Sequence, residues 1–110
     1  GVPGLLVPPE PPEGFEHVYH QFTIRITGEA STDRDTALQR IVDNGVGAGV
    51  YYPRNVFDYD CYRGHPQVIV DDVPHSTEVA AQVVSLPVHQ YLSSDDVEQI
   101  IDVVAKAVAP

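Results

Sequence analysis

Apolar and polar residues alternate from Val18 to Ile26, and this alternation is the first regular pattern along the chain. A period of two residues, rich in β-branched and aromatic side chains, predicts a strand with one buried face. Arg25 falls on the opposite, outward face of this strand. The face that we expect to be buried carries Val18, His20, Phe22, Ile24 and Ile26.

A helical pattern follows over Asp33–Asp43. Its apolar residues recur with helical spacing and predict a buried stripe of Ala37, Leu38, Ile41 and Val42. We expect Thr32 to be the N-cap, with Asp35 as its capping-box partner. Asn44 and Gly45 then supply the left-handed turn at which helices commonly end.

Two further strands are predicted after this helix. Val46–Tyr51 is apolar and rich in glycine, which indicates a strand whose backbone passes close to another part of the molecule. A short helical run over Ser76–Gln82 leads into an apolar strand over Val83–Leu86, which Pro87 ends.

The last helix has the strongest local signals in the chain. Ser93 is the expected N-cap and Asp96 its capping-box partner, while Leu92 and Val97 are spaced as a hydrophobic staple. Lys106 falls on the opposite face from the apolar residues, so we expect it to be solvated. The predicted apolar stripe consists of Val97, Ile100, Ile101, Val104 and Val108.

These elements predict a small domain of the α/β (α+β) class over residues 15–110. We expect two layers, with a sheet of about three strands and the helices packed on one face. Residues 1–14 contain five prolines, which favour an extended conformation and exclude a helix or a central strand. This segment is therefore interpreted as a linker or docking arm.

The segment from Tyr51 to Pro74 is long, aromatic and polar. A helical turn is expected near Asp58–Arg63 and a short extended piece at Gln67–Val70. Loops of this length in compact domains commonly serve a function or dock on a neighbour. A mobile surface excursion is the alternative, and the tyrosines of the segment favour docking.

The composition of the chain excludes several kinds of partner and site. The formal net charge of -10 would repel a phosphate backbone, so we expect no nucleic-acid partner. The sequence has no apolar run long enough to predict a membrane span. Its single cysteine, Cys61, fits a reducing cytoplasm. His17 and His20 point to opposite faces of the predicted strand, so we expect no metal site there. The sequence contains no recognisable catalytic motif.

The order of several short motifs resembles the C-terminal small domain of the DegT/DnrJ/StrS sugar aminotransferases, which have the aspartate-aminotransferase fold. The resemblance starts at residues 17–22 (His-Val-Tyr-His-Gln-Phe) and continues at Arg34-Asp35 and Leu38, and at Gly45-Val46. Further matches are Tyr51-Tyr52-Pro53, Pro74 with Thr77-Glu78, residues 85–89 (Ser-Leu-Pro-Val-His) and Leu92-Ser93. One departure is Arg54-Asn55-Val56-Phe57, where the family commonly has a proline and a histidine.

This resemblance implies a pyridoxal-phosphate enzyme that transfers an amino group from an amino acid, usually glutamate, to a keto-sugar nucleotide. It implies as partners a large cofactor-binding domain of the same polypeptide and a homodimer. The Schiff-base lysine would belong to that large domain, because Lys106 lies on a solvated face and a buried amine is required. We therefore expect no catalytic residue and no bound pyridoxal phosphate in this chain, and a natural start upstream of Gly1.

Within such an enzyme the chain would close one side of the active-site cleft. The residues expected to line the substrate site are Tyr51, Tyr52, Pro53 and Phe57, with Arg25 as a weaker candidate for an anionic group. A solvated surface arginine is the alternative for Arg25. The alternative for the whole chain is a free-standing α/β binding or interaction module that uses the aromatic segment as its contact surface.

Overall fold

The computed structural model of the chain describes residues 1–109, and its elements confirm the α+β class with a three-stranded sheet. In chain order they are β1 (Leu5–Leu6), β2 (Phe22–Ile26), α1 (Arg34–Asp43), the 3₁₀ turn η1 (Val56–Asp58), α2 (Pro74–Gln82), β3 (Val83–Leu86) and α3 (Ser94–Val108).

The sheet is antiparallel in the order β1-β2-β3. Leu5 pairs with Ile26, so part of the proline-rich segment forms the edge strand, where neighbouring prolines are tolerated because one side of the strand needs no partner. The predicted strand at Val46–Tyr51 is wrong, because this segment makes only an isolated bridge between Gly49 and Ser85. The assignment of residues 1–14 as a separate arm stays a prediction.

The predicted first strand is shorter than expected. It begins at Phe22 and not at Val18, which is 87% exposed. Phe22 pairs with Leu86, and Pro87 directly follows that partner and cannot donate to the ladder. Residues 18–21 therefore extend past the end of β3.

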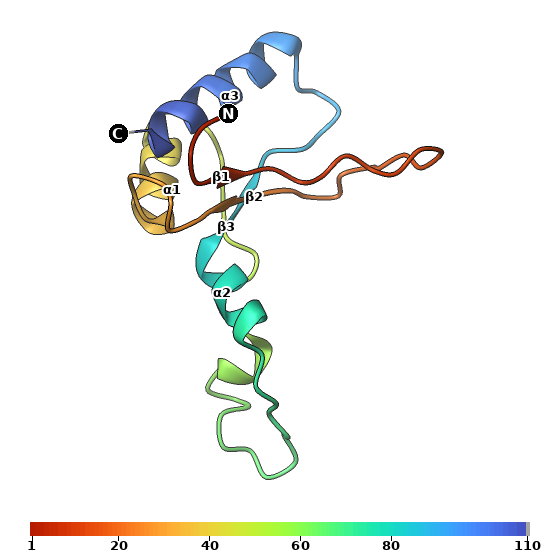
Figure 1. Ribbon diagram of the computed structural model, residues 1–110, viewed down its shortest axis with the longest axis vertical. Coiled ribbons are helices and arrows are strands. Elements are labelled where there is room, and N and C mark those ends of the chain that lie inside the picture. The colour runs from red at the N-terminus through yellow and green to blue at the C-terminus, as the bar shows by residue number, and fades with distance from the viewer. Residues whose placement is uncertain (110) are drawn as a thin grey trace.

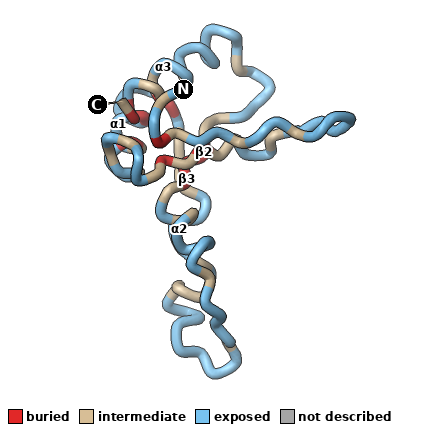
Figure 2. Tube along the Cα trace, viewed as in Figure 1, coloured by how far each residue is buried: buried red, intermediate tan, exposed pale blue. Residues whose placement is uncertain are grey.

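One face of the sheet carries the core. Ile24, Ile26 and Val84 lie there against Ala37 and Ile41 of α1 and against the last turns of α3. Figure 2 shows the buried residues gathered where the sheet meets α1 and α3. The prediction that helices pack on one face is met by α1 and α3, whereas α2 continues directly into β3 and points away from them (Figure 1).

The helix ends follow the predicted signals with one correction. The N-cap of α1 is Asp33 and not Thr32, since the Asp33 carboxylate accepts a 2.9 Å hydrogen bond from the Thr36 backbone N–H. Gly45 has a φ of 83°, which confirms the left-handed stop. At α3 the capping box between Ser93 and Asp96 is confirmed in both directions.

Two segments project from this core. The Cα radius of gyration is 16.1 Å, whereas a compact domain of this size would have one of about 13 Å. One projection carries residues 7–21, and the other carries α2 with residues 51–73 (Figure 1). In the second, a 3₁₀ turn forms at Val56–Asp58. The helical turn expected near Asp58–Arg63 follows it, since the backbone N–H groups of Tyr62 and Arg63 donate to the Tyr59 oxygen over 2.9 and 3.0 Å. The extended piece expected at Gln67–Val70 forms no strand. Both projections are mostly exposed (Figure 2).

Candidate functional site

Three of the predicted site residues, Tyr51, Tyr52 and Phe57, line one hollow of about 400 Å³. Pro53 lies between them in sequence but is not part of the wall. The opposite side of the hollow comes from α2 and the start of β3. Its remaining lining residues are Arg54, Asn55, Val56, Val73, Ser76, Val79, Ala80 and Val83. We call this site the aromatic hollow.

Hydrogen bonds attach this loop to the first turn of α2. The Asn55 amide donates to the Thr77 hydroxyl over 2.9 Å and accepts from the Ser76 hydroxyl over 2.8 Å. The Arg54 guanidinium lies 5.2 Å from the centre of the Tyr59 ring, within the range of a cation–π contact. The position of the aromatic hollow therefore depends on where α2 points.

Arg25 lies apart from the wall of the hollow, on the face of the sheet opposite the core. Its guanidinium donates to the Gln82 side-chain oxygen over 2.6 and 3.1 Å and lies 3.5 Å from a Glu78 carboxylate oxygen. Both acceptors belong to α2. Arg25 is thus brought to α2, and its predicted contact with an anionic group stays a prediction.

Arg34 is a contact residue of α2 that the sequence reasoning missed. Its Nη1 donates to the backbone oxygens of Ala80 and Val83, each over 3.2 Å, and its side chain is 12% exposed. A cation in the first helical turn is unfavourable because the N-terminal end of the helix dipole is positive. An arginine at this unfavourable position, where the ion pair with Asp35 offsets only part of the cost, indicates a contact with another part of the fold. This sequence feature could have identified Arg34 as a contact residue.

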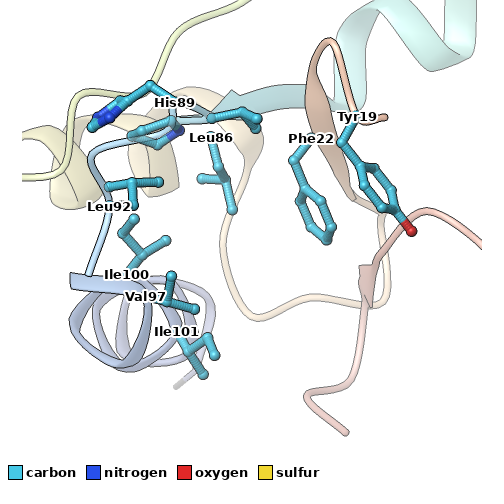
Figure 3. A pocket seen from close by; sticks show the side chains of 10 residues that line it. Tyr19, Phe22, Leu86, His89, Leu92, Val97, Ile100 and Ile101 are labelled. Atoms are coloured by element: carbon cyan, nitrogen blue, oxygen red, sulfur yellow. The ribbon is translucent and has the colours of Figure 1, made fainter. Parts of the chain in front are cut away.

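A second hollow, the apolar groove, lies between the end of β3 and the first half of α3. Figure 3 shows side chains from the start of β2 and the end of β3 facing Val97, Ile100 and Ile101 of α3. Its volume is about 430 Å³. The lining residues are Tyr19, Phe22, Leu86, Pro87, Val88, His89, Leu92, Val97, Ile100 and Ile101.

Only part of the apolar stripe predicted for α3 is buried, and the rest lines the apolar groove. Val104 and Val108 are buried as expected, but Val97 is 43% and Ile101 60% exposed. The chain supplies a covering layer of α1 and the sheet for the last turns of the helix only. Sequence periodicity identifies an apolar face and does not show whether the covering surface is in the same chain.

The lysine side chain, the group through which an enzyme binds pyridoxal phosphate covalently, lies on the surface of this domain. The sequence has one lysine, Lys106, and its side chain is 81% exposed with its amine 4.0 Å from Asp102. Such exposure matches the predicted solvated face, whereas a lysine that forms a Schiff base has to be buried. Within residues 1–109, no three His, Cys, Asp or Glu side chains are grouped to hold a metal ion.

The two perturbed carboxyl groups lie at helix ends and outside both hollows. Hydrogen bonds from the Thr36 backbone and hydroxyl lower the pKa of Asp33. Hydrogen bonds from the Ser93 hydroxyl and backbone N–H lower the pKa of Asp96. Capping explains both shifts without a catalytic role.

Among the described residues, no helix combines the length and apolar character needed to cross a membrane.

Comparison with known proteins places these features in context. The family model described as the DegT/DnrJ/EryC1/StrS aminotransferase family matches residues 1–105. A UDP-N-acetyl-3-dehydro-alpha-D-glucosamine 3-aminotransferase of Acidithiobacillus ferrooxidans is 28% identical over 98 residues, which are 89% of this chain and 24% of that protein.

Two solved structures have a similar fold. The aminotransferase TlmJ from Streptoalloteichus hindustanus matches with a TM-score of 0.77 and 28% identity over 96% of this chain and 26% of its own. DesV of S. venezuelae, solved with a ketimine intermediate, matches with a TM-score of 0.82 and 26% identity over the whole of this chain and 28% of its own. The chain thus spans about a quarter of the length of these relatives.

Proposed function

Because the chain belongs to the DegT/DnrJ/EryC1/StrS aminotransferase family, we propose that it is the C-terminal small domain of an enzyme that aminates a keto-sugar nucleotide. The amino donor in this proposal is an amino acid, glutamate. The observation that carries the proposal is the family match over residues 1–105, together with the resemblance in fold to aminotransferases of which this chain spans 26–28%.

Pyridoxal phosphate, bound by the rest of the polypeptide, would supply the electron sink for amino transfer. The exposed Lys106 does not meet the requirement for a buried amine, so the 110-residue chain alone is expected not to transaminate. Adding pyridoxal phosphate to the isolated chain should produce no absorbance band of a lysine-bound cofactor. Such a band, present in the native chain and lost in Lys106→Ala, would contradict this assignment.

The role proposed for the aromatic hollow is to contact the sugar or base of the substrate. Aromatic rings offer flat faces for stacking, and tyrosine hydroxyls can donate and accept hydrogen bonds. Tyr51 and Tyr52 are both exposed at the hollow, so their rings are available to a ligand. Pro53 shapes the loop beside them, and Arg25 is retained as a candidate for an anionic group.

Exchange of Tyr52 for phenylalanine tests this role in the full-length enzyme. Tyr52→Phe removes one hydroxyl and keeps the ring, so the KM for the sugar substrate should rise about five- to tenfold, the value of one lost hydrogen bond. Tyr91→Phe is the matched control, because Tyr91 is also exposed but lies in the turn before α3. Equal KM values for Tyr52→Phe and the native enzyme would remove Tyr52 from the site.

The partner proposed for the apolar groove is the large domain of the same polypeptide. A groove lined almost wholly by apolar side chains lacks the placed polar groups that orient a small ligand, and exposed apolar patches commonly mark contacts with protein. The relatives are about four times longer than this chain, so a covalently linked partner would face the groove at high effective concentration. A homodimer is proposed for the full-length enzyme.

A free-standing binding module is the alternative function, and the exposed aromatic loop favours it. The natural reading frame upstream of Gly1 distinguishes the two. A continuation of two more domains' length with a lysine after an apolar strand supports the aminotransferase. A start codon immediately before Gly1 would instead support the module.

A further inference from the structure

The helix α2 lies outside the core yet carries one wall of the aromatic hollow. Each of its nine residues is exposed or half-buried, and the helix points away from α1 and α3 (Figure 1). A nine-residue helix is too short to be stable on its own. Contacts from the core are therefore needed to fix its direction.

Two arginines on core elements supply such contacts. Arg34, in the first turn of α1, donates to the carbonyl oxygen of Ala80 in the last turn of α2 and to that of Val83, the C-cap of α2 and first residue of β3. Arg25, on β2, donates to Gln82, and Gln82 in turn donates to Glu78 over 3.2 Å. Carbonyls in the last turn of a helix lack helical partners, and the negative end of the helix dipole favours a cation there.

We propose that Arg25 and Arg34 are positioning residues that fix the orientation of α2 and, through it, the aromatic hollow. The relay continues from α2 to the loop through the hydrogen bonds of Asn55 to Ser76 and Thr77. Val79, Ala80 and Val83 then form the wall opposite the tyrosines. In this role the guanidinium of Arg25 acts on the side chains of α2.

Hydrogen exchange on the 110-residue chain tests this relay without reference to any activity. Arg34→Met keeps the aliphatic stem and removes the donors. Because a hydrogen bond from a charged group contributes about 1.5 kcal/mol, the amides of α2 should exchange about tenfold faster. The loop amides of Asp58 and Tyr59, which bond to Asn55 and Val56, should follow α2. Arg34→Lys, which keeps a cationic donor, should restore most of the protection.

Arg40→Met is the matched control. Arg40 lies on the same helix and donates over 3.0 Å to the Ala107 carbonyl near the end of α3. Its loss should speed exchange only in the last turn of α3, at the amide of Ala109 for example. If Arg34→Met leaves the loop amides unchanged, the relay is refuted. If it speeds exchange throughout the core, Arg34 supports the whole fold, and the positioning role is refuted for it.

Arg25→Met keeps the proposal testable in that second case, because Arg25 contacts α2 from the far face of the sheet. It should speed exchange in α2 and in the loop and leave exchange in α1 and α3 unchanged.

A second experiment measures enzyme kinetics and rests on the proposed aminotransferase activity. In the full-length enzyme Arg34→Met should raise the KM for the sugar several-fold with little change in kcat. An exchange effect without a KM effect would refute only the substrate role of the hollow.

Discussion

Ile41 and Ile101 are a matched pair of helical isoleucines, one in the core and one in the apolar groove. Ile41 of α1 is 0% exposed, whereas Ile101 of α3 is 60% exposed. Truncation to alanine removes the equivalent of three methylene groups, each contributing about 0.8 kcal/mol when buried. With the added cost of a cavity, Ile41→Ala should lower the free energy of unfolding of the 110-residue chain by about 3–4 kcal/mol.

Ile101→Ala should cost less than about 1 kcal/mol in the same chain, because less than half of the side chain is covered. Alanine is also the better helix former, which offsets a few tenths of that cost. Urea unfolding followed by far-UV circular dichroism measures both values from the midpoint and slope. Equal costs for the two variants would refute the division of α3 into a buried half and an exposed half.

The same pair tests the proposed domain contact in the full-length polypeptide. If the large domain covers the groove, Ile101→Ala loses contacts that the isolated chain does not make, and its cost should rise by about 1 kcal/mol or more. The cost of Ile41→Ala should stay unchanged. Residue-resolved hydrogen exchange of α3 reports both, since global unfolding of a multidomain protein is not a two-state process. An unchanged cost for Ile101→Ala would show that the large domain packs elsewhere.

Two further predictions concern local structure. Ser93→Ala should lower the free energy of unfolding by about 1 kcal/mol, measured by urea unfolding. Since the pKa of Asp96 lies below its ordinary value of 3.8, the stability from this pair should be complete above that value and be lost as the pH falls through the lowered folded pKa. Ser93→Ala should flatten that acid-side fall, and an unchanged fall would contradict the capping assignment. Gly4→Ala should release β1, because Gly4 has a φ of 73° and a Cβ there would overlap the Ala30 backbone nitrogen. Gly14→Ala, at a φ of 85° with open space around it, should cost only about 1 kcal/mol. Equal thermal midpoints for these two glycine variants would show that β1 contributes little.

Several elements could be predicted from the sequence because their causes are local. The capping box of Ser93 and Asp96 depends on residues three apart, and the stop at Asn44–Gly45 depends on one left-handed residue. The strand Val83–Leu86 was predicted with its observed bounds, since Pro87 ends it and a helix precedes it. The wrong N-cap of α1 differs by one position, where Thr32 and Asp33 are both good caps.

The candidate site was predicted in part. Tyr51, Tyr52 and Phe57 are close in sequence and line one hollow, and their role in binding a substrate stays a prediction. The opposite wall, from α2 and β3, depends on contacts between residues more than twenty positions apart. No local pattern specifies such contacts.

The sequence by itself determined the α+β class with a sheet of about three strands, the start of α3 and the aromatic character of the loop. Only the tertiary structure decided which segment fills the edge of the sheet, where Leu5 and Leu6 pair with β2 in place of Val46–Tyr51. It also divided the apolar stripe of α3 between core and groove, and it joined Arg25 and Arg34 to α2. The physical reason is that periodicity and capping depend on neighbours along the chain. Edge pairing, burial and helix-end contacts depend on what the fold brings alongside.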